Sequence, residues 1–178
     1  MEALRAAALF LQATLGWSVT EAYAGQDPAA VQALSAPAGR VVLSLDGNVK
    51  TTNAQGRADF DIAMLEKLPK VTITTDTPWT DGKRTYEGVP LKQVLEAAGA
   101  RGETLKVTAL NAYHATIPVD QAVNDGAIIA YKADGAYLPV DDRGPLWILF
   151  PFDAKPQLRS EAVYEWSAWQ LRKLTVKD

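Results

Sequence analysis

Short runs of apolar and β-branched residues, separated by turn residues, predict several β-strands. Val71-Thr72-Ile73-Thr74-Thr75 is mostly β-branched and favours a strand. Leu146-Trp147-Ile148-Leu149-Phe150 is apolar throughout, so we expect a central strand that is covered on both faces. The tail from Val163 to Val176, which contains Trp166 and Trp169, is expected to be amphipathic and strand-like. Similar runs predict strands over Val41–Leu45, Leu105–Leu110 and Ala127–Tyr131.

Two short helices are expected among these strands. Asp59 can cap the first helix, and Pro69 ends it. Its apolar positions are spaced three apart, at Ile62, Leu65 and Leu68. Pro90 stands at the first position of the second helix, and Gly99 can close that helix in a left-handed conformation. The apolar face of the second helix consists of Leu91, Val94, Leu95 and Ala98. Helices and strands follow one another irregularly, without the regular βαβ spacing of a doubly wound sheet.

The N-terminal segment predicts export. Arg5 precedes an apolar stretch, and Ala22-Tyr23-Ala24 has the small-x-small pattern of a signal-peptidase site. The stretch is too short and too interrupted to span a bilayer. We therefore expect residues 1–24 to be a signal peptide and the mature protein to be periplasmic; the alternative is an ordinary amphipathic helix. Residues 25–39 are rich in Ala, Pro and Gln and are expected to form a linker or loose arm, and residues 40–178 a single domain.

The amino-acid composition excludes several common kinds of catalytic and metal-binding site. The chain has 178 residues, of which 48% are hydrophobic and 22% charged, so it can build a globular core. Its net charge of −3 offers no basic surface for nucleic acid. There is no cysteine, which excludes disulfides, thiolate metal sites and thiol nucleophiles. His114 is the single histidine, so a His-rich metal cluster is excluded as well. No serine lies in a nucleophile elbow, and glycine-rich phosphate loops are absent.

Three segments at strand ends favour ligand binding instead. In residues 75–82, Trp79 lies between a proline and a turn, where an indole can stack on a flat ring or close the end of the core. In residues 109–114, Asn111 offers a donor and an acceptor and Tyr113 a ring and a hydroxyl, or both simply shape the loop.

The third segment, residues 141–145, contains an acid–base pair. Asp142 can accept hydrogen bonds from a guanidine-like edge, and Arg143 can donate to a carbonyl or an anion. The structural alternative is a surface turn closed by an Asp–Arg pair. Together the three segments predict a planar polar heterocycle as the ligand. A pterin meets these requirements, and spacing alone does not separate it from a flavin fragment or a purine.

The order of these motifs resembles the molybdopterin-binding oxidoreductase domain of the sulfite-oxidase fold. The resemblance covers roughly residues 40 to 176, and the segments that carry it are Thr75–Trp79, Tyr86–Leu91, Ala109–Tyr113, Ile117-Pro118 and Asp142–Trp147. It implies an α+β fold with mixed β-sheets and a few short helices. It also implies a pterin site lined by Trp79, Asn111, Tyr113, Asp142 and Arg143, with the adjoining Gly144.

The chain also departs from the enzymes of that family. Their molybdenum is ligated by a cysteine thiolate in the loop after the strand corresponding to Leu105–Leu110, and this chain has no cysteine. The basic cluster for the cofactor phosphate is reduced to Arg143, with His114 and Lys132 as weaker candidates.

The chain more closely resembles short exported members that bind a metal-free pterin. Such members are associated with membrane receptors that make or degrade cyclic di-GMP, or that are histidine kinases. We therefore expect a periplasmic pterin-binding sensor that signals to the external domain of a membrane protein and binds no molybdenum. The alternatives are a molybdenum oxidoreductase with a non-thiolate ligand and an adaptor that has lost all ligands.

Overall fold

The structure is a computed structural model and describes residues 34–178, which belong to one compact unit. The expected signal peptide and residues 25–33 of the expected arm lie outside the described residues. The described end of the arm, residues 34–39, has no regular secondary structure. It is attached to the domain by two hydrogen bonds: the side-chain amide of Asn53 donates to the Ser35 carbonyl at 2.7 Å, and the Gly39 amide donates to Asp61 Oδ2 at 2.7 Å.

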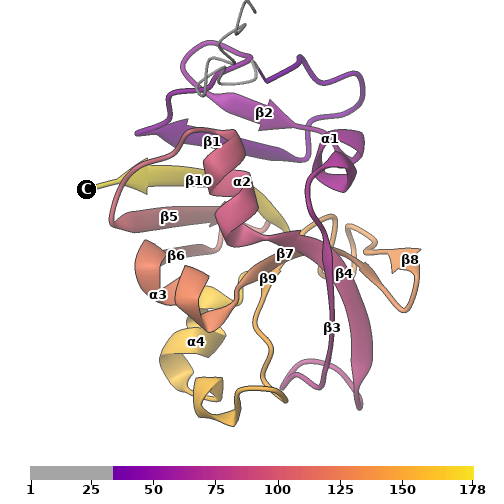
Figure 1. The fold of residues 1–178 in the computed structure, drawn as a ribbon. Coiled ribbons are helices and arrows are strands. Elements are labelled where there is room, and N and C mark those ends of the chain that lie inside the picture. The colour runs from indigo at the N-terminus through magenta and orange to yellow at the C-terminus, as the bar shows by residue number, and fades with distance from the viewer. Residues whose placement is uncertain (1–33) are drawn as a thin grey trace, which may run out of the picture. The chain divides into compact units, whose positions relative to one another are not determined.

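Two sheets, the first mixed and the second antiparallel, form the framework of the domain (Figure 1). The first sheet has the order β2-β1-β10-β5-β6, and only its β1–β10 pair is parallel. Its strands are β1 (Leu43–Gly47), β2 (Ala58–Phe60), β10 (Leu171–Lys177), β5 (Thr104–Ala109) and β6 (His114–Pro118). The second sheet has the order β3-β4-β7-β8, with β9 paired to β7. Its strands are β3 (Val71–Thr75), β4 (Arg84–Pro90), β7 (Ile128–Ala133), β8 (Ala136–Tyr137) and β9 (Trp147–Leu149).

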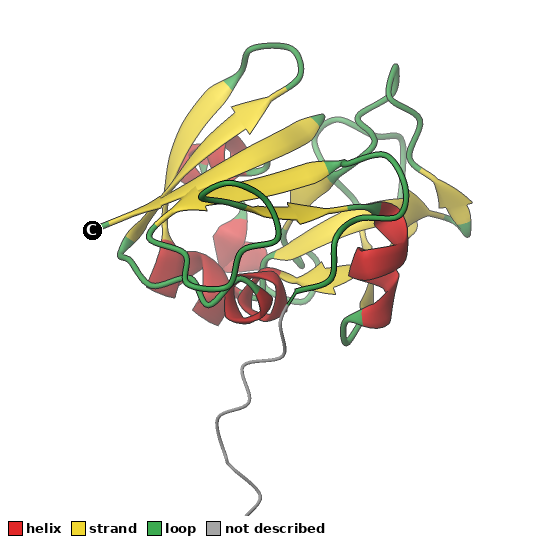
Figure 2. Cartoon of the chain, turned by 90° about the horizontal axis from the view of Figure 1, so that it is seen from above, coloured by secondary structure: helices red, strands yellow, loops and turns green. Residues whose placement is uncertain are grey.

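The described helices are all short, as Figure 2 shows. They are α1 (Ile62–Lys67), α2 (Leu91–Ala97), α3 (Val119–Asp125), the 3₁₀ turn η1 (Pro156–Leu158) and α4 (Glu161–Trp166). Helices of this length are marginal in water, so their stability comes from capping and packing. None of the helices in residues 34–178 is long and apolar enough to cross a membrane. The predicted α+β fold is confirmed.

The core lies where the inner faces of the strands meet the helices. Strand alternation buries Leu43 and Leu45 of β1 completely, while Ser44 between them faces outward. The predicted apolar face of α2 is confirmed, because all four of its residues are buried. Gly99 follows that helix with a φ of +56°, in the left-handed conformation that was expected.

Four of the local predictions are wrong in detail. Asp61, not Asp59, caps α1, and its carboxylate accepts from the Met64 amide at 2.8 Å. Asp59 belongs to β2 instead. Pro90 is the last residue of β4 and the N-cap of α2, one position before the helix.

The other two corrections concern the C-terminal part of the chain. β9 is buried as expected, but among the described residues its ladder partner is β7 alone, so it is not a central strand. The predicted strand over 163–176 is divided into α4 and β10, because Ser160 caps a helix there. The correction to the tail has a local cause, since a short apolar run suits a buried strand and a short buried helix equally. The correction to β9 concerns only its place in the sheet.

Candidate ligand-binding site

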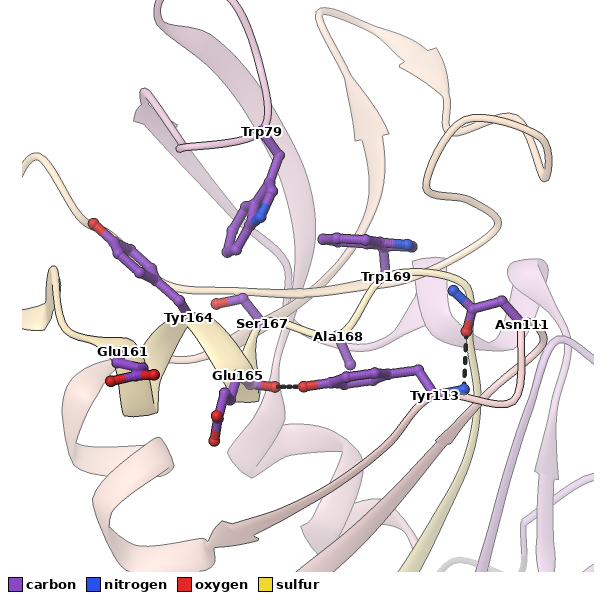
Figure 3. A pocket seen from close by; sticks show the side chains of 9 residues that line it. All are labelled: Trp79, Asn111, Tyr113, Glu161, Tyr164, Glu165, Ser167, Ala168 and Trp169. Carbon is purple, nitrogen blue, oxygen red and sulfur yellow. Dashed lines mark hydrogen bonds between the residues drawn. The ribbon is translucent and has the colours of Figure 1, made fainter.

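A cavity of about 480 Å³ opens between the loop joining β3 to β4, the loop joining β5 to β6, and α4 with the segment that follows it (Figure 3). Aromatic rings make up much of its wall. The residues that line it are Trp79, Asn111, Tyr113, Glu161, Tyr164, Glu165, Ser167, Ala168 and Trp169. Three of them, Trp79, Asn111 and Tyr113, are among the residues predicted for a pterin site.

Trp79 is held in place by its own loop and by its aromatic neighbours. The Trp79 amide donates to the Thr77 hydroxyl at 3.3 Å, and the Thr77 and Thr80 hydroxyls are 2.7 Å apart. Its ring meets Trp169 and Tyr164 edge to face, with centroids 5.5 and 5.6 Å apart. Trp79 therefore has a fixed orientation at the cavity before any ligand arrives.

Trp79 also belongs to the core. Its ring lies edge to face with Trp147, at a centroid distance of 5.9 Å, and Trp147 is almost fully buried. The interpretation of Trp79 as a residue that closes the end of the core is therefore confirmed, and its place in the cavity wall is compatible with the stacking interpretation. One edge of the indole closes the end of the core, and the half-buried ring forms part of the cavity wall.

Asn111 and Tyr113 come from the loop between β5 and β6. Asn111 Oδ1 accepts from the Tyr113 amide at 3.1 Å, which shapes the loop around Ala112, a residue with a φ of +63°. The Asn111 side-chain nitrogen has no hydrogen-bond partner among residues 34–178, and Figure 3 shows it turned toward Trp169. This nitrogen is thus a free donor at the cavity.

The Tyr113 phenol connects this loop to the opposite wall. Its hydroxyl donates to the Glu165 carbonyl at 2.8 Å, and in Figure 3 its ring is seen edge-on, like that of Trp169. Partial burial, followed by the nearby Glu165 carboxylate, raises the pKa of the Tyr113 phenol above its ordinary value. The phenol therefore keeps its proton at neutral pH, and the bond across the cavity is maintained.

The third wall consists of α4 and the residues after it, which sequence reasoning did not assign to the site. Ser167 is buried; its hydroxyl donates to the Val163 carbonyl at 2.8 Å, and its own carbonyl accepts from Trp147 Nε1 at 3.0 Å. These bonds fix the end of the helix and aim Trp169 at the cavity. Ser160 followed by Glu161, Tyr164 and Glu165 at helical spacing was the available signal, because i, i+3 and i+4 residues share one helix face.

Asp142, Arg143 and Gly144 do not line this cavity. Arg143 donates to the Asp142 carboxylate and to the Trp79 carbonyl, and its guanidinium lies 5.7 Å from the Trp147 ring centroid. Gly144 is buried, and a Cβ there would approach the Leu138 carbonyl oxygen to 2.0 Å, so this turn needs glycine for close packing. This turn contacts Trp79 through the hydrogen bond from Arg143 to the Trp79 carbonyl. The Asp142–Arg143 pair that was the structural alternative for this segment is observed.

The basic candidates for a phosphate site are occupied or lie elsewhere. A separate polar pocket of about 460 Å³ beyond Trp79 contains Lys83, Arg84 and Arg143. Lys83 is paired with Asp153 at 2.7 Å, and Arg84 with Asp134 at 2.7 Å. His114 is exposed on β6 near the Thr108 hydroxyl, and Lys132 pairs with Glu66 at 2.9 Å. Neither of these two lines the aromatic cavity.

Residues 42–153 match the family model described as the oxidoreductase molybdopterin-binding domain. The chain belongs to this family. No curated protein matches it in a search of the whole sequence. The matched region contains β1 through β9 and the loops that carry Trp79 and Asn111. The third wall of the cavity, which is formed by α4 and Trp169, lies beyond it.

The residues of the cavity suit the pterin ring of the family's cofactor, but they do not suit its metal or its phosphate. Aromatic rings and the Asn111 amide suit a flat pterin ring. A bond from molybdenum to a cysteine thiolate of the protein is impossible because the chain has no cysteine, and residues 34–178 contain no group of three His, Cys, Asp or Glu placed to hold a metal. The cavity wall carries two carboxylates and no lysine or arginine, which does not suit a phosphate.

Proposed function

We propose that this protein is an exported sensor that binds a metal-free pterin and regulates a membrane receptor. The observation that carries the proposal is the aromatic cavity, which offers stacking surfaces and hydrogen-bonding groups but no sulfur ligand for a metal. Trp79 and Trp169 pack against the flat ring. The free Asn111 nitrogen donates to the ring carbonyl, and Arg143 acts indirectly by holding the Trp79 loop.

Signalling requires a partner that distinguishes the two states of the sensor. A receptor responds only by as much as the bound and free forms differ in their affinity for it. Tyr113, Glu161 and Glu165 are exposed at the cavity mouth, where the external domain of a membrane protein would contact both the ligand and the sensor. The resemblance to short exported regulators supports a cyclic di-GMP enzyme or a histidine kinase as this receptor.

Membership of an oxidoreductase family favours a second candidate, a molybdenum oxidoreductase whose metal ligand is not a thiolate. One experiment separates the two functions. The full chain is expressed with its N-terminal segment in a Gram-negative host and purified from the periplasm. The bound small molecule is identified by fluorescence and mass, and the metal content by elemental analysis.

We expect about one pterin per chain and no stoichiometric molybdenum. Stoichiometric molybdenum together with turnover of a redox substrate would establish the enzyme instead. A folded protein that neither carries nor binds any pterin would leave only the ligand-free adaptor.

A further inference from the structure

We propose that the cavity selects its ligand by charge, accepting neutral or cationic pterins and rejecting those with a carboxylate or phosphate substituent. This inference rests on the proposed function, because it concerns the ligand of the same cavity. Such selection excludes, as a ligand of this cavity, the phosphate-bearing cofactor that the family name implies.

The first observation is the placement of two carboxylates at the cavity. Glu161 and Glu165 both line it and are one turn apart on α4, so they lie on the same side of the helix. Both residues are exposed, and neither forms an ion pair with any residue between 34 and 178. Like charges at this spacing repel each other, and a ligand with N–H donors or a positive charge relieves that repulsion.

The second observation is that no unpaired cation compensates these carboxylates among residues 34–178: Arg159 lies beside Tyr164, but Asp76 and Asp153 already pair with it. No lysine or arginine occurs among the nine residues that line the cavity. The nearest basic side chains that the structure places beside Trp79 are those of the second pocket. Lys83, Arg84 and Arg143 are engaged there by Asp153, Asp134 and Asp142 respectively. An anionic substituent that reached them would have to displace an existing carboxylate partner.

The aromatic rings of the cavity also disfavour an anionic ligand. The face of an indole or phenol ring carries partial negative charge, so it attracts cations and N–H groups and repels anions. Four such rings, those of Trp79, Tyr113, Tyr164 and Trp169, line this cavity. The amino-imine edge of a pterin supplies N–H donors, whereas a phosphate on its side chain supplies charge of the wrong sign.

Two pterins that differ in one substituent test the inference. Hydroxymethylpterin is neutral near pH 7 and carboxypterin is negatively charged, while their rings are the same. Affinities for both are measured by fluorescence quenching with the wild-type chain and with the double variant Glu161→Gln, Glu165→Gln. The Tyr113 hydrogen bond is preserved in this variant, since it uses the backbone carbonyl of Glu165.

Glu103→Gln is the matched control. Glu103 is also exposed, but it precedes β5, whereas Asn111 follows the opposite end of that strand. We expect the wild type and the control to bind hydroxymethylpterin about fivefold or more tightly than carboxypterin. In the double variant the ratio falls to about twofold or less. Added salt lowers the wild-type ratio, because exposed charges are screened.

The outcomes separate this inference from the proposed function. If both pterins bind and the wild type does not discriminate against carboxypterin, charge selection is overturned while pterin binding stands. An unchanged ratio in the double variant overturns it as well, because the carboxylates would then have no part in the choice. If neither pterin binds to the folded wild type, the proposed function fails and this inference with it.

Discussion

Trp79 serves the core and the cavity at once, because its edge contacts Trp147 while its ring lines the proposed pterin site. Trp79→Phe keeps part of the core contact and loses stacking area. We expect pterin affinity to fall by about three- to tenfold, the range of a lost aromatic contact. Calorimetric titration measures it. Trp166→Phe is the control, since Trp166 packs on Phe150 and does not line the cavity. Equal losses in both variants would remove Trp79 from the site.

Arg143 is a positioning residue for Trp79. Its guanidinium donates to the Trp79 carbonyl and lies over the Trp147 ring. Arg143→Ala frees the loop, so we expect weaker pterin binding by about three- to tenfold, less than the full effect of a hydrogen bond to a charged group because Arg143 acts on the ligand only through Trp79. Indole fluorescence should change as well, because Trp79 loses its fixed surroundings. Arg84→Ala, which breaks only the pair with Asp134 in the same pocket, should leave affinity nearly unchanged. An unaltered affinity in Arg143→Ala would contradict this role.

At the scale of the elements, Asp61 joins α1 to the chain that precedes the domain. One carboxylate oxygen caps the helix through the Met64 amide, and the other accepts from the Gly39 amide. Asp61 is almost fully buried, so Asp61→Ala leaves both amides without a partner. We expect a loss of about 2–3 kcal/mol in the free energy of unfolding, measured by urea denaturation. Asp61→Asn can keep one bond and should lose less; equal losses would show that capping is not the cause.

Asp153 joins the β3–β4 loop to η1 and so supports the segment that leads into α4. Lys83 and Arg159 each approach its carboxylate to 2.7 Å, and its amide donates to the Thr75 hydroxyl at 3.1 Å. The hydrogen bond from Lys83, followed by hydrogen bonds with Asp76, holds the pKa of Asp153 well below its ordinary value. A depressed pKa stabilises the fold above the unfolded pKa of about 3.9, and this stability is lost as the pH falls through the folded pKa.

The variant Asp153→Asn tests this linkage. It should be less stable than the wild type at neutral pH and should lose less further stability on acidification below about pH 4. Urea denaturation at several pH values measures both effects. Asp125→Asn is a suitable control, because Asp125 forms no ion pair with a residue of the described domain. Parallel pH profiles for wild type and Asp153→Asn would refute the linkage.

At the scale of the whole molecule, the predicted export signal has a direct readout. We expect the mature protein recovered from the periplasm to begin at Gly25, because Ala22-Tyr23-Ala24 has the pattern that signal peptidase recognises. Intact-mass measurement decides the point. Replacing Ala24 with a bulky residue should block cleavage and leave the longer chain. Recovery of wild-type protein that still begins at Met1 would disprove the predicted signal.

Local pattern was sufficient for several elements and for three of the residues that line the cavity. β3 was predicted at its observed bounds, since β-branched residues favour an extended chain wherever it lies. The buried face of α2 follows from residues three and four apart. Trp79, Asn111 and Tyr113 were identified because they stand at strand ends, where loops of a sheet protein can line a pocket.

Long-range packing decided the rest. The apolar positions of the tail with Trp166 and Trp169 are compatible with a strand or a helix; the Ser160 cap begins α4, and pairing with β1 and β5 in the assembled sheet makes the rest β10. Arg143 was expected to touch the ligand, but a long side chain can turn either way, and the folded core directs it to the back of Trp79. Residue types and short spacings are properties of neighbouring positions along the chain. The meeting of Trp79 with Trp169 depends on how distant segments fold together, and a single sequence does not encode that proximity in any local pattern.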